Sequence, residues 1–238
     1  MDKDLNLKVF LPGTEKQFSH LFKNVDLAGK TMLIMGCGCE GIAKAMLSYS
    51  PDISIILNDQ NSLVESRYQL KEEKRVKVIM MDYMNTDFSE AQFDIVYTQA
   101  SISAKERNKI VKEIKRILKP DGILNVGEIV SLQEPVPAFV SDTWKTIGLL
   151  PLSTLQITTY YEGKNFEVIS EEDLTDTLKE HYRRTKEQIR TKVKFLPDEE
   201  AAFNQKLINR IKHEANIYLK LGGDKYIGFK SIIMRKQS

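Results

Sequence analysis

Short apolar runs alternate with amphipathic stretches over the first half of the chain. Runs rich in Val, Ile, Leu and Met lie at residues 31–35, 53–57, 76–80, 93–98 and 122–130. Apolar residues at helical spacing predict helices at 15–22, 41–49, 62–73 and 104–118. Buried strands show continuous apolar runs, whereas surface helices repeat their apolar positions every 3.6 residues. The alternation therefore predicts a parallel sheet with helices on both faces.

The pattern changes after residue 130. Prolines punctuate a stretch that we expect to be irregular and that contains Trp144, Tyr160 and Tyr161. A short strand at 165–170 and two long helices follow, the helices at 174–194 and 198–221, and 226–234 predicts a closing strand. We interpret this second half as an insertion before the last strand of one fold, a position that usually supplies a lid or a substrate-binding cap.

A glycine-rich loop follows the first apolar run, with glycines at Gly36, Gly38 and Gly41, and a helical pattern follows the loop. The second apolar run ends at Asp59, eighteen residues past Gly41. In open α/β sheets such a turn lets the backbone approach a nucleotide, and the acid accepts hydrogen bonds from the ribose. The loop therefore predicts an adenosine-containing cofactor. Its literal spacing also matches a nicotinamide dinucleotide site.

The composition of the chain limits the kinds of partner that we expect. The net charge is +2, from 35 basic and 33 acidic residues, which gives no electrostatic case for nucleic acid. No window approaches the roughly 18 apolar residues of a membrane span, and the first residues show no apolar core of a signal peptide. Cys37 and Cys39 lie too close on a tight loop for a disulfide, and no nearby His or Cys completes a metal site. We expect no membrane partner, no bound metal and a cytoplasmic location.

Three later features recur in a known order. Asp82, Tyr83 and Met84 follow the third apolar run, the fourth run begins at 93–97, and residues 116–124 join a helix to the fifth run. With the glycine loop, these motifs resemble the class I S-adenosylmethionine-dependent methyltransferases over about residues 30–130. The tail is more loosely similar, in its layout, to small-molecule N-methyltransferases of the phosphoethanolamine and sarcosine type.

The resemblance implies an α/β, Rossmann-like, doubly wound fold with a mostly parallel seven-stranded sheet whose last strand is antiparallel. It implies three parts. Residues 1–29 form a lead-in over the site. Residues 30–130 and 224–238 form the S-adenosylmethionine-binding domain, and residues 131–223 form a substrate-binding helical cap.

The resemblance also assigns cofactor residues by position in the motifs. Gly36 and Gly38 bring the loop close to the methionine part of the cofactor, Asp59 binds the ribose, and Asp82 accepts from the adenine amino group. The full set of implied cofactor-binding residues is Gly36, Cys37, Gly38, Gly41, Asp59, Gln60, Asp82, Tyr83, Met84 and Thr98. Structural alternatives remain open: a purely structural turn for the loop, a helix N-cap for Asp82, and core packing for Tyr83 and Met84.

Methyl transfer from a sulfonium to nitrogen or oxygen is an in-line displacement with a neutral leaving group, so alignment and desolvation are the main tasks. Residues expected to face the methyl acceptor are Gln99, His181, Tyr182 and Tyr160, with Ser101, Glu128, Tyr161 and His20 as further candidates. A solvent-facing position on an Arg-rich helix is the alternative for His181. The Tyr160–Tyr161 pair offers cation–π contacts or forms the core and edge of a strand.

Two positions depart from the family pattern. Ile34 stands where an acid usually precedes the loop, and Glu40 replaces the third glycine. We predict an enzyme that uses S-adenosylmethionine, with S-adenosylhomocysteine as product, to methylate nitrogen or oxygen of a small molecule. The departures motivate an alternative, a non-catalytic partner or regulatory protein with this fold. A nicotinamide-dependent oxidoreductase, prompted by the literal glycine spacing, is a third hypothesis, and the lack of a second substrate domain argues against it. The sequence leaves the oligomeric state undetermined.

Overall fold

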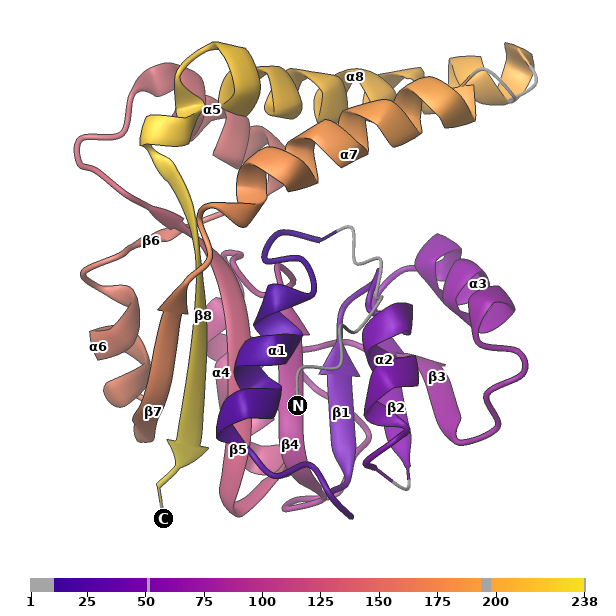
Figure 1. Cartoon of the computed structure of the whole chain (residues 1–238), viewed down its shortest axis with the longest axis vertical. Coiled ribbons are helices and arrows are strands. Elements are labelled where there is room, and N and C mark those ends of the chain that lie inside the picture. Colours follow the sequence, from indigo (N-terminus) through magenta and orange to yellow (C-terminus); the bar gives the residue numbers. More distant parts are fainter. Residues whose placement is uncertain (1–10, 51, 194–197, 238) are drawn as a thin grey trace.

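The computed structural model describes residues 11–50, 52–193 and 198–237, and a single twisted sheet forms its centre (Figure 1). The sheet has eight strands in the order β3-β2-β1-β4-β5-β8-β7, and β6 pairs with β5. The strands are β1 (Met32–Met35), β2 (Ile53–Leu57), β3 (Val76–Met80), β4 (Phe93–Gln99), β5 (Leu118–Ser131), β6 (Leu152–Ser153), β7 (Phe166–Asp173) and β8 (Ile227–Lys236). Strands β1 to β5 are parallel, and β8 is antiparallel to both of its neighbours. The predicted, mostly parallel sheet with an antiparallel last strand is confirmed, but it has eight strands in the described residues instead of seven, because the short strand β6 also pairs with β5.

Helices cover both faces of the sheet because successive strand residues point to opposite sides. In β1, Met32 and Ile34 pack with α1 (Lys16–Asn24), α2 (Glu40–Met46) and α3 (Gln60–Gln69). Leu33 and Met35 pack on the other face with α4 (Arg107–Ile117) and α6 (Ile157–Glu162). Since β1 is apolar at all four positions, it is buried on both faces, as the sequence predicts for a central parallel strand.

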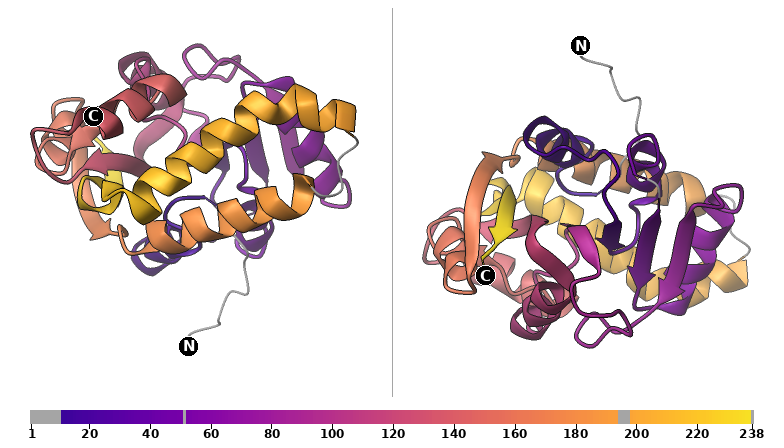
Figure 2. Two further views of the ribbon diagram at one scale, coloured as in Figure 1. Left: turned by 90° about the horizontal axis from the view of Figure 1, so that it is seen from above. Right: turned by 90° about the horizontal axis from the view of Figure 1, so that it is seen from below.

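Three helices lie above the ends to which the parallel strands point: α5 (Ala138–Ile147), α7 (Thr177–Val193) and α8 (Asp198–Lys220) (Figure 1). Seen from above, α7 and α8 cross over the sheet side by side (Figure 2). A third apolar cluster, with Val140, Leu178 and Tyr218 from these helices, joins them to Ile129 and Phe229 of the sheet. We call α5, α7 and α8 the helical cap.

The segment expected to be irregular is partly helical, so that prediction was wrong. Pro137, with φ −60°, stands immediately before α5, and Gly148, with φ 77°, ends it. A proline at a helix start and a left-handed glycine just past its end are boundary signals, not signs of irregular chain. Residues 157–162 form α6, and the short strand predicted at 165–170 extends as β7 to residue 173. The segment 131–223 therefore supplies two strands of the sheet as well as the cap.

The remaining boundaries differ by a few residues from the prediction. The strands at 53–57 and 76–80 coincide with it, while the helix predicted at 104–118 begins at Arg107. Asp121 adopts a φ of 59° in β5, which short polar side chains tolerate. No helix in the described part of the chain combines the length and apolar character needed to cross a bilayer.

Candidate active site

The glycine-rich loop joins β1 to α2 at the carboxyl edge of the sheet. Gly36 has a φ of 126° and Gly38 a φ of 80°, a region that favours glycine. A Cβ on Gly36 would lie 2.7 Å from the Cβ of Ser101, whose hydroxyl donates to the Met35 carbonyl at 2.6 Å. Gly36 is therefore required by the close approach of the chain that follows β4.

Asp59 begins α3 next to this loop. Its carboxylate accepts a hydrogen bond from the Ser62 N–H at 2.9 Å, and this bond lowers the pKa of Asp59. Cys37 lies beside Ser62 and Asp59, and burial raises the pKa of its thiol above the ordinary value. The edge therefore carries an exposed, ionised carboxylate and an uncharged thiol, with Gln60 exposed in the first turn of α3.

The three residues after β3 have different surroundings. Asp82 is exposed and accepts from the Met84 N–H at 2.8 Å, which closes a turn rather than capping a helix. Tyr83 is buried, its hydroxyl donates to the Ile56 carbonyl at 3.3 Å, and burial raises its pKa. Met84 is half-buried against the same apolar cluster. The geometry gives Tyr83 a core position and leaves Asp82 at the surface of the site.

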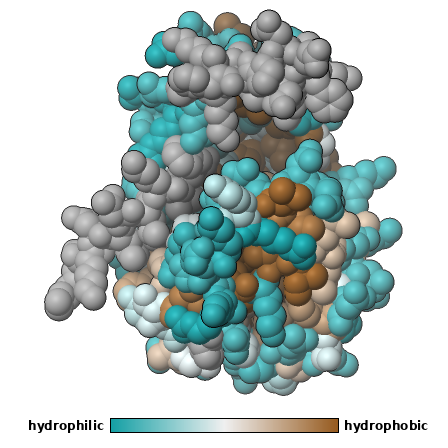
Figure 3. Space-filling view, turned by 90° about the vertical axis from the view of Figure 1, so that its right-hand side faces the viewer, coloured by the Kyte–Doolittle hydropathy of each residue, from teal (hydrophilic) through white to brown (hydrophobic). Residues whose placement is uncertain are grey.

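Apolar side chains gather beside these residues on the face over α3 and β3 (Figure 3). Val64 and Tyr68 of α3 are 59% and 70% exposed, and Met80 at the end of β3 is 51% exposed. Large apolar side chains at a sheet edge are a natural surface for a flat aromatic ring. This patch adjoins Asp82, the residue expected to accept from an adenine amino group.

The side-chain amide of Gln99 is hydrogen-bonded to the lead-in segment. Its amide nitrogen donates to the carbonyls of Pro12 and Thr14 at 2.8 and 2.9 Å, and its amide oxygen accepts from the Tyr97 hydroxyl at 2.7 Å. Gln99 is only 1% exposed. It holds residues 11–15, which we call the N-terminal strap, and its polar atoms do not face an acceptor. Thr98 is fully buried, and its hydroxyl has no hydrogen-bond partner among the described residues.

Both departures from the family pattern have a structural explanation. Ile34 is fully buried and lies opposite Ile55 on one side and Tyr97 on the other, so the position of the missing acid is apolar. Glu40 is buried at the start of α2 and accepts a hydrogen bond from the Ser66 hydroxyl of α3. The residue that replaces the third glycine therefore joins two helices instead of distorting the loop.

The two candidates on α7 have different environments. Tyr182 lies between α7 and α8, where its hydroxyl donates to Glu214 at 3.0 Å and its ring stacks on Tyr218 at 4.7 Å. Burial raises the pKa of Tyr182 well above its usual value. His181 is half-buried and contacts the Tyr182 ring edge at 4.9 Å. Tyr182 therefore belongs to the interior of the cap.

Tyr160 and Tyr161 lie on α6, so the alternative that they form the core and edge of a strand is wrong. Tyr161 donates to Glu128, which also accepts from Ser103 and Arg107 at 2.9 Å each. Tyr160 donates to Asn108 at 2.9 Å, and its ring lies 5.8 Å from the Arg107 guanidinium.

The geometry separates Glu128 from Gln99. Gln99 pairs with Gly127, so Glu128 points to the opposite face of the sheet. Tyr160 lies beside Tyr161, which bonds Glu128 on that opposite face, and Tyr182 lies inside the cap. The structure therefore does not bring the four residues expected at the acceptor into one cluster: Gln99, His181, Tyr182 and Tyr160.

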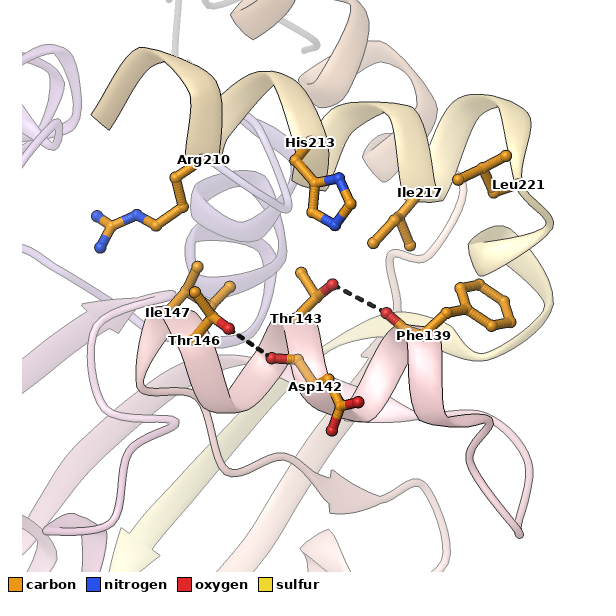
Figure 4. A pocket seen from close by; sticks show the side chains of 9 residues that line it. All are labelled: Phe139, Asp142, Thr143, Thr146, Ile147, Arg210, His213, Ile217 and Leu221. Carbon is orange, nitrogen blue, oxygen red and sulfur yellow. Dashed lines mark hydrogen bonds between the residues drawn. The ribbon is translucent and has the colours of Figure 1, made fainter. Parts of the chain in front are cut away.

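The other two histidines lie away from the loop. His20 is buried between hydroxyls of Ser231 and Ser170, at 2.8 and 2.9 Å, and burial lowers its pKa. His213 is exposed and lines a groove of about 230 Å³ between α5 and α8 (Figure 4). Among the described residues, no group of three or more His, Cys, Asp or Glu side chains is placed to hold a metal ion.

Comparison with known proteins relates part of the chain to a family. Residues 33–126 match the family described as "Methyltransferase domain". This segment, less than half of the chain, is therefore similar to a methyltransferase domain. The matched residues run from β1 to the middle of β5 and include the glycine loop, Asp59 and Asp82. The strand order of the sheet extends this domain beyond the matched segment, through β8 and β7.

Relatives of the methyltransferase domain act on different acceptors. The sterol 24-C-methyltransferase of Aspergillus fumigatus is 30% identical over 105 residues, which are 42% of this chain and 28% of that protein. The chain thus spans less than a third of that relative. The phosphoethanolamine N-methyltransferase 2 of Haemonchus contortus, solved with phosphomonomethylethanolamine and S-adenosylhomocysteine, has a TM-score of 0.77 at 19% identity. That match covers 98% of this chain and 55% of the other.

The fold is that of the S-adenosylmethionine-dependent methyltransferases, as predicted, and it hosts more than one chemistry. The solved [4+2]-cyclase SpnF has a TM-score of 0.76 at 20% identity, covering 94% of this chain and 80% of that chain. Structural likeness at this level of identity establishes the fold alone, so the reaction must be argued from the site.

Proposed function

We propose that the methyltransferase domain transfers a methyl group from S-adenosylmethionine to a nitrogen or oxygen of a small molecule. The observation that carries the proposal is the arrangement at the carboxyl edge of β1 to β3. There a loop with two left-handed glycines, an ionised carboxylate at Asp59 and an exposed carboxylate at Asp82 follow consecutive strands. Open α/β sheets bind nucleotides at this edge.

The residues present suit this cofactor. Gly36 and Gly38 carry no side chain where the loop would approach the methionine moiety, and Asp59 has a depressed pKa suited to accepting from two ribose hydroxyls. When bound, S-adenosylmethionine supplies an electrophilic methyl group on a sulfonium with a neutral leaving group. The loop and the two carboxylates would orient it, and the strap and cap would exclude water. Alignment and desolvation account for most of such a reaction.

A lone-pair acceptor agrees best with the charges of the described site. Methylation of a carbon–carbon double bond creates a cation that needs stabilising groups, but the buried carboxylate Glu128 points to the face of the sheet opposite Gln99 and is paired with Arg107 at 2.8 Å. A nitrogen or oxygen acceptor needs a base only if it arrives protonated. The sterol 24-C-methyltransferase relatives make carbon the competing acceptor.

A compact acceptor and a reducing compartment complete the proposal. The cap packs its apolar cluster against the sheet. The chain has a net charge of only +2, which does not favour nucleic acid as the acceptor. The two thiols, Cys37 and Cys39, are free. We propose a cytoplasmic enzyme on this basis. Its donor-binding part comprises residues 30–130 and 224–238 together with strands β6 and β7 of the inserted segment, and His181 is the acceptor-side residue to test first.

Binding and turnover test the proposal in two steps. Isothermal titration with S-adenosylhomocysteine should show one site per chain. Asp59→Asn should weaken the binding, while Asp142→Asn, an exposed carboxylate of α5 in the groove between α5 and α8, should not. Release of S-adenosylhomocysteine is then measured against a panel of amines, phenols, carboxylic acids and sterols. Absence of binding sinks the proposal, and turnover with sterols alone replaces nitrogen or oxygen by carbon.

A second function is a non-catalytic or differently catalytic protein with this fold. The hydrogen bonds of Gln99 favour this second function. Gln99 is the residue expected beneath the reacting atoms, but its amide nitrogen already donates to two carbonyls of the strap. The cyclase with the same fold shows that the scaffold is not restricted to methyl transfer. Binding of S-adenosylhomocysteine without turnover of any acceptor class would favour this function.

A further inference from the structure

The N-terminal strap lies between the cap and the carboxyl edge of the sheet, where it appears in indigo above α1 (Figure 1). Pro12, Gly13 and Thr14 are buried, although they belong to no helix or strand. Buried irregular chain needs partners for its backbone groups, since an unpaired polar group in the interior is unfavourable. The strap finds these partners on both sides.

On the side of the sheet, Gln99 provides two hydrogen bonds to the strap carbonyls of Pro12 and Thr14. The Tyr97 hydroxyl donates to the amide oxygen of Gln99, which orients the amide nitrogen toward the strap. On the side of the cap, the Gly13 N–H donates to the Thr177 hydroxyl at 3.0 Å. The strap is therefore held by β4 and by the first residue of α7 together.

The held strap covers the glycine loop. The methyl groups and Cγ of Leu11 lie 3.2 to 3.6 Å from the position that a Cβ on Gly38 would take. Leu11 also packs against the apolar cluster that includes Cys39, which is 1% exposed. Gly13 lies against the Phe229 ring, where a Cβ would approach within 2.3 Å, so the strap packs closely on β8 and leaves no space for a side chain at this position.

We propose that Gln99 is a positioning residue for the methyl-donor site. It holds the strap closed over the glycine loop and couples the loop to the cap through Gly13 and Thr177. The inference rests on the proposed function for its ligand, but the contacts that define it do not depend on that function. Ligand then exchanges only when the strap opens, and Gln99 sets how often it opens.

Cysteine labelling measures the opening directly. The chain has two cysteines, so Cys37→Ser leaves Cys39 as a single thiol beneath the strap. When opening is fast and rare, the labelling rate by N-ethylmaleimide is proportional to the open population. Gln99→Leu removes the two hydrogen bonds to the strap, together with the one from Tyr97, and loss of the two strap bonds should raise this rate about 5- to 150-fold. Thr177→Val removes the contact with Gly13 and should raise it about 2- to 13-fold.

The matched control is Thr143→Val. Thr143 is a buried threonine of α5 whose hydroxyl donates to the Phe139 carbonyl at 2.9 Å, away from the strap. The same substitution there should leave Cys39 labelling within about twofold of the parent, because a single neutral hydrogen bond contributes little to global unfolding. If Gln99→Leu does not fold, Thr177→Val against this control still decides the matter.

Ligand kinetics separate positioning from general damage. Surface plasmon resonance with S-adenosylhomocysteine, with Cys37 intact, should show that Gln99→Leu raises association and dissociation rate constants by a similar factor. The equilibrium Kd should change less than about threefold, because the closed state remains dominant. A merely structural role would weaken Kd instead.

Three results would overturn the inference. Labelling of Cys39 in Gln99→Leu and Thr177→Val no faster than in Thr143→Val means that Gln99 does not hold the strap. Faster labelling with unchanged ligand rate constants, or with a weakened Kd, means that the strap does not control the donor site. If the unsubstituted protein fails to bind S-adenosylhomocysteine, the proposed function fails, while the labelling still reports whether Gln99 holds the strap.

Discussion

Replacing Ile34 by the acid that the family usually carries should destabilise this protein strongly. Ile34 is fully buried, with 0% of its surface exposed to solvent. It lies between Ile55 of β2 and Tyr97 of β4 in the sheet. Ile34→Asp therefore removes a buried side chain and places a carboxyl group in an apolar cluster. The substitution tests whether the position still belongs to the cofactor loop or has become core.

The magnitude follows from two contributions. Loss of the buried isoleucine side chain costs about 2 kcal/mol. Burial can raise a carboxyl pKa by 3–5 units, so at pH 7 the group is held neutral at roughly 1.4 kcal/mol per unit between its ordinary pKa near 3.9 and the solution pH, about 4 kcal/mol. The sum, about 6 kcal/mol, compares with a total stability of about 5–15 kcal/mol. The melting temperature of a chain of this size should fall by about 12–24 °C.

Urea unfolding at pH 7 and pH 5 measures both contributions, with Ile34→Val as the control at about 1 kcal/mol. A carboxyl whose pKa is raised by folding binds more protons in the folded state, so its penalty grows as pH rises above about 3.9. The gap between Ile34→Asp and the control should therefore shrink by about 2.7 kcal/mol from pH 7 to pH 5. A variant as stable as the control at pH 7, or one that binds S-adenosylhomocysteine more tightly, refutes the reasoning.

Three further outcomes are expected. Asp59→Asn should keep the melting temperature within about 2 °C, because Asn caps a helix as well as Asp, but weaken S-adenosylhomocysteine binding about 10- to 100-fold in titration calorimetry; unchanged affinity contradicts a ribose role. Gly36→Ala should lower the unfolding free energy in urea by more than 2 kcal/mol, because its Cβ meets Ser101, whereas Gly148→Ala, with a φ of 77° and open space, should lose about 1 kcal/mol; equal losses contradict the close approach. Burial lowers the pKa of His20 below 6.5, so the unfolded chain binds more protons than the folded one as the pH falls. Acidification from pH 7.5 to 5.5 should therefore lower the unfolding free energy of the parent protein more than that of the His20→Asn variant; parallel pH profiles contradict this.

The sheet could be predicted because its information is local. Each parallel strand is an apolar run, and its length and flanking turns are visible without knowledge of its partners. Helix α5 was missed because Pro137 and Gly148, which bound it, are equally typical of irregular chain. Strand β7 was found only in part, since it continues through the acidic residues Glu171 to Asp173, whose pairing with β8 the local pattern does not show.

The positions of the glycine loop and Asp59 at the carboxyl edge of the sheet were predictable for the same reason, but the surroundings of Gln99 and Tyr160 were not. The glycine turn and Asp59 are separated by a single βα unit, so their spacing carries their geometry. Gln99 depends on carbonyls 87 and 85 residues earlier, and Tyr160 on a side chain 52 residues earlier. Residue type and strand position place Gln99 at the right end of β4, but only the fold shows that its amide is already bonded.

The two departures in the loop do not by themselves indicate lost activity. Had Glu40 been a buried carboxylate without a partner, the first turn of α2 would carry a penalty of several kcal/mol. Its hydrogen bond from Ser66 offsets that penalty and fixes α2 against α3, the two helices that flank the proposed donor site. Had Ile34 left polar loop groups unpaired, the loop would be strained, but the Gly36 N–H donates to the Ile56 carbonyl at 3.2 Å and Ser101 bonds the Met35 carbonyl. The two polar groups of the peptide bond that precedes the loop's first glycine are therefore bonded to β2 and to the chain after β4, so the loop keeps its shape without the acid.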